Sequence, residues 1–428
     1  MIDWGQESSQ DAIMSKLKNI ADRQYTYDHS IINLIASDNA SPLDYSRLDC
    51  YDTISVQEGN AGQRPFAGAV LHDEVEAYVR QVACIAFGAE HANIQPHSCS
   101  QANEAVYSAF LEPGDRVLAL SYLSGGHLTH GMRMNFSGRN YEFHHFKLGA
   151  NEQIDYGQVA TMATRLHPKL IMCGASAYPR CYRYEALRAA ADSVGARLVF
   201  DISHEAGLIL GGAFPSPVGC ADAVTLSMDK TLRGRHGGMI LARKADAKRI
   251  DHAVHPGVQS SFAVRKLYDA GLALAQATTS EFREYASRTV AMARRCADLA
   301  NMVAPGCVVA GGTDKHYLII DVFKAFNIMG TEAERLLEQA GVLSNRQATP
   351  RDSTSKIRDA RGIRLGFAWM ASRGFSVADL DILFPAINEC LSSRDVSGLG
   401  RLPPYCGSNV PSMYGKMLLV SITDGMDN

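Results

Sequence analysis

Lys230 is the residue of this sequence whose position points most directly to chemistry. It stands in "TLSMDKTLRGRHGG", residues 225–238, after a β-branched, strand-like run and before a loop rich in glycine and basic residues. Most lysines are solvated surface charges, and by residue type alone Lys230 would be one of them. At the carboxyl edge of a buried strand, however, a lysine amine loses its proton more readily and can form a Schiff base.

Asp201 occupies a comparable position in "LVFDISHEAGL", residues 198–208, with His204 three residues later. Active sites of open α/β sheets lie outside the carboxyl ends of the strands. A carboxylate at that edge can pair with a cationic ring nitrogen. The alternative is a buried aspartate that is satisfied by local backbone donors, because a buried charge needs partners in either case.

The segment "HSCSQAN", residues 97–103, ends a strand-like run and opens directly into a helix. Ser98 and Ser100 can supply a cap and hydroxyl donors, and the free backbone N–H groups of a helix start favour an anion. Taken alone, this segment is more simply interpreted as a plain N-cap, since serine is common there.

Two histidines, His127 and His130, lie in the glycine-flanked loop "GGHLTHG", residues 125–131. Such a pair can suggest a metal, but no acidic or third ligand follows at helical spacing. We therefore expect no metal here. A ring that stacks on an aromatic ligand, or a structural histidine, is the favoured interpretation.

These signals gain weight in combination. Pyridoxal 5'-phosphate (PLP) needs an anion-binding helix start, a carboxylate that keeps its pyridine nitrogen protonated and a lysine that forms a Schiff base. Residues 97–103, Asp201 and Lys230 meet these three needs. The sequence therefore predicts PLP as the cofactor, with the protein supplying orientation and electrostatics.

The composition argues against several other classes of function. The chain has 428 residues, 46% of them hydrophobic, and a net charge of -3, which favours neither nucleic acid nor an anionic membrane as partner. It contains no apolar run of membrane-spanning length, and its first ten residues do not resemble a signal peptide. None of the 10 cysteines forms a CxxC pair, so neither a zinc ribbon nor a disulfide framework is indicated. We expect a reduced, cytoplasmic protein without a structural metal.

The elements that must position these residues alternate between helices and short apolar strands from about residue 80. We expect strands at 116–122, 169–175, 197–203, 223–228 and 238–243, with helices such as "QANEAVYSAFL" and "YEALRAAADSVG" between them. This alternation predicts an α/β fold with a mostly parallel sheet covered on both faces. A long helical segment at 262–303 is expected to lead into a second domain.

Several of these motifs resemble the serine hydroxymethyltransferases, which are fold-type I PLP enzymes. The similarity runs from "INLIASDNAS" (32–41) to "RGIRLGFAWMASRGF" (361–375), and its most specific segments are "NIQPHSCSQANEAVYSAFLEPGDRVL", "GGHLTHGMRMNFSG", "GASAYPR", "FDISHEAGLI" and "GGTDKHYLIIDV". The resemblance implies an aspartate-aminotransferase-like fold with a seven-stranded type of sheet. It divides the chain into a helical arm (1–45), a large PLP-binding domain (46–275), a smaller α+β domain (276–402) and a tail (403–428).

The resemblance also implies a role for each candidate residue. Lys230 is the Schiff-base lysine, Asp201 the pyridinium partner and His127 the ring that stacks on the cofactor. The remaining cofactor contacts are the phosphate-binding residues and the groups near the phenolic oxygen: Ser98, Cys99, Ser100, Gly257, Ser176 and His204.

On the substrate side, Arg364 clamps the carboxylate of an amino acid with the help of Ser37, through the bidentate geometry of a guanidinium. Glu58 matches the carboxylate that serves as acid and base toward the β-hydroxyl group or folate. An obligate homodimer, or a dimer of dimers, with active sites shared between subunits is also implied.

Departures from the family pattern gather near the lysine and at folate-facing positions. Met228 and Asp229 stand where Thr-His is usual, and Arg235-His236 replaces Pro-Arg before the paired glycines. Asp229 is equally consistent with pairing to a cation and with capping the turn. Other departures place different residues where a glycine, an alanine, three tyrosines and a folate-contacting asparagine are usual: Cys99, Ser203, Val56, Pro65, Phe66 and Gln347.

Three functional hypotheses follow. The first is a hydroxymethyltransferase that makes or breaks the Cα–Cβ bond of serine, or of an α-substituted analogue such as α-methylserine, with tetrahydrofolate as a candidate cosubstrate. The second is a folate-independent threonine-type aldolase or transaldolase. The third, from another class, is a non-catalytic cofactor-binding homologue, which the presence of Lys230, Asp201, His127 and Arg364 disfavours.

Overall fold

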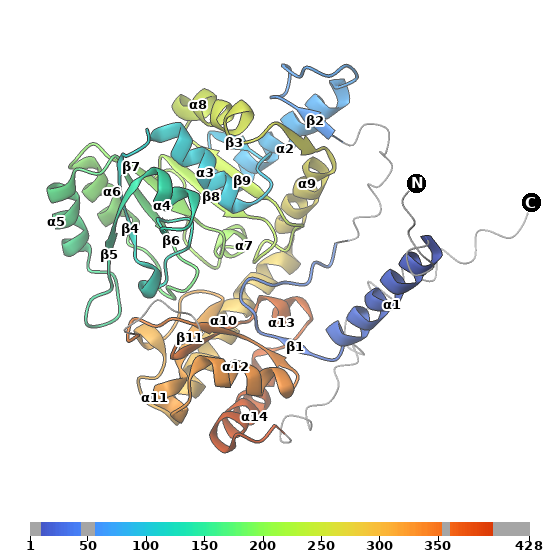
Figure 1. Ribbon diagram of the computed structural model, residues 1–428, viewed down its shortest axis with the longest axis vertical. Helices are drawn as coiled ribbons and strands as arrows, with labels where there is room; N and C mark the ends of the chain where they lie inside the picture. Colours follow the sequence, from blue (N-terminus) through green and yellow to red (C-terminus); the bar gives the residue numbers. More distant parts are fainter. Residues whose placement is uncertain (1–9, 44–55, 353–359, 397–428) are drawn as a thin grey trace, which may run out of the picture.

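The computed structural model describes residues 10–43, 56–352 and 360–396, and a seven-stranded sheet forms the upper part of the molecule in Figure 1. Its strand order is β3-β9-β8-β7-β6-β4-β5. The strands are β3 (His91–Asn93), β4 (Arg116–Leu120), β5 (Glu142–Phe146), β6 (Leu170–Gly174), β7 (Arg197–Asp201), β8 (Ala223–Ser227) and β9 (Gly238–Ala242).

The sheet is parallel except for one strand. β4, β5, β6, β7 and β8 run parallel to one another, whereas β9 is antiparallel to both β8 and β3. The predicted mostly parallel sheet and its five predicted strands are therefore confirmed, each with ends trimmed by one or two residues. β3 and β5 were not predicted; β5 reads "EFHHF" and lies at the edge of the sheet, where a mixed polar pattern is tolerated.

Both faces of the sheet are covered, which explains the continuous apolar character of the strands. Val117 and Ala119 of β4 pack into a core with helix α3 (Cys99–Phe110), while the alternating Leu118 and Leu120 face the larger core on the other side. Successive side chains of a strand point to opposite faces, so each strand supplies both cores. Because β3, β4, β6, β7 and β8 run in the same direction, their carboxyl ends lie at one edge of the sheet.

A smaller region follows along the chain. The predicted helical segment at 262–303 is two helices, α9 (Arg265–Ala277) and α10 (Ser280–Val303), because Thr279 begins a new helix by capping the backbone N–H of Phe282. β11 (Tyr317–Asp321), β14 (Gly362–Gly366) and β13 (Asn345–Gln347) then form a three-stranded antiparallel sheet. Helix α12 (Gly330–Gln339) packs on this sheet, and α14 (Leu380–Ser393) packs on α12 and α10.

The N-terminal part of the chain lies beside this smaller region. Helix α1 (Gln10–Asp28) stands away from the body in Figure 1. β1 (Ile32–Asn33) pairs in parallel with β12 (Val342–Leu343), which places the following residues, including Ser37, against the smaller region. The expected tail at 403–428 lies outside the described residues, and the domain boundaries stay predictions.

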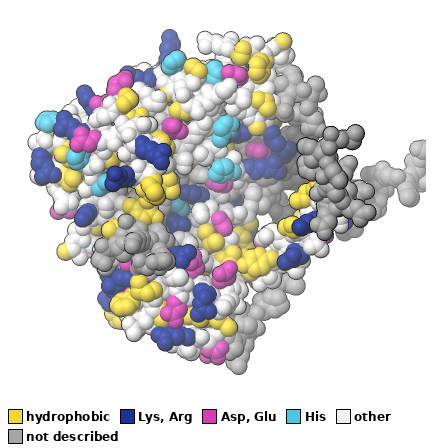
Figure 2. Space-filling model, viewed as in Figure 1, with side chains coloured by type: hydrophobic (Ala, Val, Ile, Leu, Met, Phe, Trp, Pro, Cys, Tyr) yellow, Lys and Arg dark blue, Asp and Glu magenta, His cyan; other side chains and the backbone are white. Residues whose placement is uncertain are grey.

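Basic and acidic side chains are interspersed over the face shown in Figure 2. Within the described parts of the chain, no helix is both long and apolar enough to cross a membrane.

Candidate active site

A cavity of about 350 Å³ opens at the carboxyl edge of the large sheet, which is the size range of small-molecule sites. Nine of the twelve candidate residues line it: Ser37, Ser98, Cys99, Ser100, His127, Ser176, Asp201, His204 and Lys230. The other lining residues are Asp38, Ala175, Ser203, Ser227, Asp229 and His236. These residues lie far apart in the sequence, and they meet because parallel strands end at a common edge.

Asp201, the last residue of β7, is 9% exposed and accepts several hydrogen bonds. Its Oδ1 accepts from the backbone N–H (2.9 Å) and the hydroxyl (2.5 Å) of Ser203, and its Oδ2 accepts from Nδ2 of Asn103 at 2.9 Å. Burial opposes the charge, but His127, His130 and Lys230 lower the pKa of Asp201 below its ordinary value. The carboxylate is thus ionised, and Oδ2 retains acceptor capacity toward a cationic ring nitrogen.

Asn103 of helix α3 links this carboxylate to the stacking histidine. Its Nδ2 also donates to Oγ1 of Thr129 (3.0 Å), which is 2.7 Å from Nδ1 of His127, and its Oδ1 accepts from Oγ1 of Thr225 (2.6 Å). Burial lowers the pKa of His127, which keeps its ring neutral and suited to stacking. Sequence reasoning missed Asn103 and Thr129, although a buried asparagine on an otherwise apolar helix face was a readable signal.

Lys230 follows β8 and lies beside two buried histidines. Its Nζ is 3.3 Å from Nε2 of His204, and Nδ1 of His204 is 3.0 Å from Nε2 of His316. Burial, reinforced by Lys230 and Arg364, lowers the pKa of both histidines well below the ordinary value. A neutral His204 therefore accepts from Lys230 and donates to His316. His316 lies in the quoted motif "GGTDKHYLIIDV", but no residue of that motif was singled out from the sequence.

Behind these histidines lies a buried ion pair formed by their sequence neighbours. Lys315 and Glu205 are 0% and 3% exposed, and their charged atoms are in direct contact. Burial opposes the charge of Lys315, but Glu205 raises its pKa above the ordinary value. Aromatic rings surround the ammonium group, the nearest being that of Tyr182 with its centroid 5.2 Å away.

The start of helix α3 forms the end of the cavity expected to hold a phosphate. Ser98 is the N-cap, and its hydroxyl oxygen accepts from the backbone N–H of Gln101 at 3.2 Å. Burial raises the pKa of Cys99 well above the ordinary value, so the side chain in the usual glycine position is a neutral thiol. β9 packs so closely here that a Cβ at Gly238 would overlap the carbonyl oxygen of Ser98.

Arg364 reaches this edge from β14 and is 7% exposed. Its Nη1 donates to the carbonyl oxygen of Ser176 (2.5 Å), and its Nε donates to Oδ1 of Asn345 (3.2 Å). Burial lowers its pKa. Arg364 has no ion-pair partner among the described residues, and a buried guanidinium without a carboxylate fits an anionic ligand.

Three candidate residues do not line this cavity: Arg364, which lies beside it, and Glu58 and Gly257, which lie elsewhere. Glu58 ends β2 (Val56–Glu58), which pairs with β10 (Ser261–Ala263), and its Oε1 is 3.4 Å from Nε2 of His255. Gly257 lies in the helical turn Ala253–Val258 that precedes β10. Neither residue lines the cavity of its own chain. They lie near each other, because the turn that contains Gly257 leads into β10, which pairs with β2.

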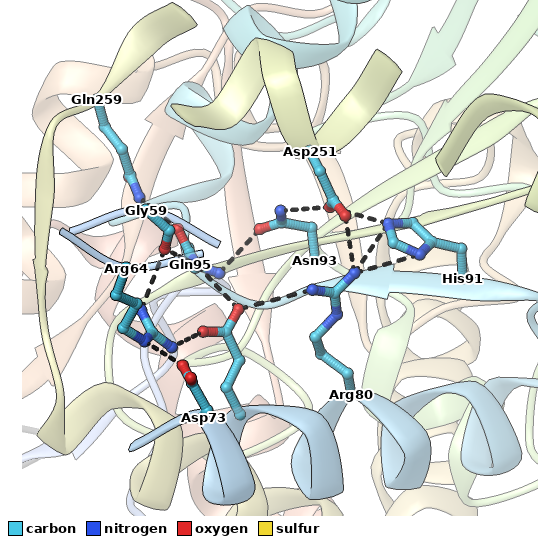
Figure 3. Close-up of polar contacts among 10 residues, drawn as sticks. Gly59, Arg64, Asp73, Arg80, His91, Asn93, Gln95, Asp251 and Gln259 are labelled. Carbon is cyan, nitrogen blue, oxygen red and sulfur yellow. Dashed lines mark hydrogen bonds and ion pairs between the residues drawn. The ribbon is translucent and has the colours of Figure 1, made fainter. Parts of the chain in front are cut away.

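A buried polar network supports the end of β2 (Figure 3). Arg64, whose side chain is 1% exposed, contacts Glu76, donates to Oδ1 of Asp73 at 2.6 Å and donates to the carbonyl oxygen of Gly59 at 3.1 Å. Gln95 joins Glu76 (2.8 Å) to the same carbonyl group (3.2 Å). The network thus fixes the backbone directly after Glu58.

The departures from the family pattern lie in different surroundings. Val56 and Phe66 are 42% and 44% exposed, whereas Gln347 is 8% exposed and donates to the carbonyl oxygen of Ala348 at 3.3 Å. Asp229 and His236 line the cavity, and Nδ1 of His236 lies 2.5 Å from Oδ2 of Asp229.

These residues fit PLP. A cavity of sufficient size combines a helix start, a buried carboxylate with a free lone pair and a lysine amine. The ligand atoms of His127, His130 and Asp201 also lie within 4.8 Å of one another, so the sheet supplies the third group that was not evident from the spacing. The absence of a metal stays a prediction.

Comparison with known proteins gives one consistent result. A family model described as serine hydroxymethyltransferase matches residues 7–387. A serine hydroxymethyltransferase of Mycoplasma capricolum is 39% identical over 91% of this chain and 94% of its own length, and that of Mesoplasma florum is 40% identical over the same shares. The Acidobacterium capsulatum enzyme is 39% identical over 87% of each chain.

Proposed function

We propose, because this chain belongs to the serine hydroxymethyltransferase family, that it makes or breaks the Cα–Cβ bond of a β-hydroxy-α-amino acid. The family consists of PLP-dependent transferases with tetrahydrofolate as cosubstrate. The observation that carries the proposal is the position of Lys230 and Asp201 in one cavity beside the buried Arg364, which has no ion-pair partner among the described residues. Serine and glycine, or an α-substituted pair such as α-methylserine and alanine, are the proposed substrates.

The side chains divide the work. When bound, PLP supplies an electron sink for the bond that is cleaved. Lys230 would hold the cofactor covalently, Asp201 would keep its ring nitrogen protonated, and His127 would stack on the ring. Arg364 and Ser37 bind the substrate carboxylate and so orient the Cα–Cβ bond. Glu58 is the proposed base for the β-hydroxyl proton.

Glu58 can serve in this way if a second copy of the chain supplies it, so we propose a homodimer in which each active site contains residues of both subunits. We propose the cytoplasm as its location. Two helices present exposed apolar side chains that a second copy could cover. On α1 these are Ile13, Met14, Leu17 and Ile20, and on α2 (Val70–Phe87) they are Val70, Leu71, Tyr78 and Ile85.

The covalent site is tested by borohydride reduction of the protein with PLP, followed by peptide mapping. Lys230 should carry the label, and Lys230→Ala should carry none; a label on another lysine would refute the assignment. Arg364→Lys keeps the charge but loses the planar fork, and it should raise KM for the amino acid about 10- to 100-fold.

A folate-independent aldolase is the second candidate. It is favoured by Val56 and Phe66, which offer no hydroxyl group where tyrosines are usual. Product release from serine with and without tetrahydrofolate, beside acetaldehyde release from threonine, separates the two functions. Strict dependence on folate supports hydroxymethyl transfer, whereas folate-independent acetaldehyde release supports the aldolase.

A further inference from the structure

Asp229 and His236 form a pair on the wall of the cavity next to Lys230. The hydroxyl of Ser227 donates to Oδ1 of Asp229, and Nδ1 of His236 lies 2.5 Å from Oδ2. A carboxylate only accepts, so Nδ1 carries a hydrogen and Nε2 is the edge of the ring left for another partner. The side chain of His236 is 68% exposed, which places this edge at the rim of the cavity.

The backbone brings His236 to the phosphate end of the site. Two residues later, Gly238 begins β9, and its N–H donates to the carbonyl oxygen of Pro96 at 2.9 Å. Gly238 also packs directly on Ser98, the N-cap of α3. His236 and residues 98–100 therefore line one cavity and are joined by a short, fixed backbone contact.

The described lining of the cavity offers few side chains that could balance the charge of a phosphate at this end. Its acidic lining residues are Asp38, Asp201 and Asp229. Burial lowers the pKa of His127 and His204, which keeps both rings neutral. Lys230 is committed to the cofactor carbonyl, so His236 is the remaining side chain in the described lining that can oppose a phosphate charge of about -1.5 to -2.

A second lysine near this end does not fill that role. Lys266 is 8% exposed and does not line the cavity, and its Nζ contacts the carbonyl oxygens of Pro96 and Gly238. Burial lowers its pKa to about 7, which leaves it only partly charged near neutral pH. Lys266 also feels the charge of Asp229 and acts on His97, and Arg235, the residue before His236, lies 3.8 Å from Asp269.

We propose that His236, oriented by Asp229, is a cationic contact of this chain for the phosphate of PLP. Nε2–H of the protonated ring donates to a phosphate oxygen at the start of α3, and Asp229 is the positioning residue that fixes the tautomer. This inference rests on the proposed function, because it assumes PLP as the ligand. It assigns a role to two of the four residues by which the lysine loop departs from the family pattern.

The test compares PLP with pyridoxal, which lacks the phosphate, by measuring the dissociation constant of each at pH 6.5. For His236→Gln we expect PLP binding to weaken about tenfold while pyridoxal binding stays unchanged, since one charge-assisted contact to the phosphate is removed. His236→Arg keeps a cation and should preserve most of the preference for PLP. A matched control is His144→Gln, because Nε2 of His144 pairs with Oε1 of Glu142 at 2.8 Å and lies outside the cavity.

The outcomes are distinguishable. An equal loss for PLP and pyridoxal in His236→Gln would show a structural role and overturn the inference. Unchanged binding of both ligands would overturn it too, as would a preference in His236→Arg as low as in His236→Gln. If the unaltered protein binds no PLP, the proposed function itself fails.

Discussion

Two aspartates flank Lys230 on the wall of one cavity, and their surroundings differ. Asp201 is 9% exposed and takes hydrogen bonds from Ser203 and Asn103, which come from a strand end and a helix. The side chain of Asp229 is 29% exposed, and its partners are Ser227, which ends β8, and His236 in the loop that follows. A buried charge needs several fixed donors, whereas a charge at a rim needs few.

The difference shows how far each aspartate is constrained by its neighbours. A change at Asp201 would disturb contacts to β7, α3 and the His127 loop at once. The side-chain hydrogen bonds of Asp229 with described residues lie within residues 227–236, although its charge also acts on Lys266. Asp201 thus belongs to a rigid wall of the site and Asp229 to its rim, while the buried departures Cys99 and Ser203 show that the wall varies too.

The largest expected effect is the contrast between Asp201→Asn and Asp229→Asn. Without its carboxylate, position 201 cannot hold a protonated ring nitrogen, and we expect kcat to fall at least about 1,000-fold. For Asp229→Asn we expect a loss of about tenfold or less in kcat/KM, because only the orientation of an exposed ring is affected. Steady-state kinetics on serine checks both values, and equal losses would contradict the comparison.

The next prediction concerns the buried ion pair of Lys315 and Glu205. Lys315→Met alone leaves Glu205 buried and uncompensated, which should lower the free energy of unfolding by about 3–5 kcal/mol. Glu205→Leu combined with Lys315→Met should restore most of it, because an apolar pair needs no ionic partner. Urea unfolding of the single and double variants measures this, and additive losses would argue against a coupled pair.

A smaller effect is expected from acid. His204 and His316 have folded-state pKa values well below 6.5, so the unfolded chain binds protons that the folded chain does not. Their contribution to stability is complete above about pH 6.5 and falls as the pH drops, by up to about 1.4 kcal/mol per unit for each ring. In His316→Asn the decline between pH 6.5 and 5 should be shallower, and an unchanged slope in urea unfolding would refute this.

The smallest contrast lies between two serines. Ser203→Ala removes a hydroxyl donor from buried Asp201 and should lower kcat/KM about fivefold, corresponding to roughly 1 kcal/mol. Ser227→Ala removes the equivalent donor from the more exposed Asp229, where water can replace it, and should change kcat/KM less than twofold. The reverse order would show that the rim is the more sensitive part of the site.

Much of the architecture could be predicted from local patterns. The five predicted strands and the helices at 99–110 and 184–192 have strong apolar periodicity, which short-range physics largely determines. β5 and the break at Thr278–Thr279 escaped prediction, because an edge strand tolerates polar residues and a cap in a long helical pattern is a weak signal.

At the site, residue types at the ends of strands were sufficient to indicate Lys230, Asp201 and the start of α3. The roles of Glu58, Gly257 and Arg364 came from the family resemblance alone. His316, Asn103 and Lys315 escaped prediction, because their importance lies in contacts across more than 90 residues of sequence. Such contacts leave no periodic pattern in the chain.

The sequence by itself determined the cofactor class from residue types at the ends of strands, the family from the resemblance of several motifs, and the parallel sheet from the alternation of helices and strands. Only the tertiary structure decided which charges are buried and which lie at the rim. It placed Asp201 within a network of fixed donors, gave Arg364 no carboxylate partner among the described residues and held Glu58 away from its own cavity. Burial and pairing depend on elements that approach from distant parts of the chain, and these properties set the electrostatics of the site.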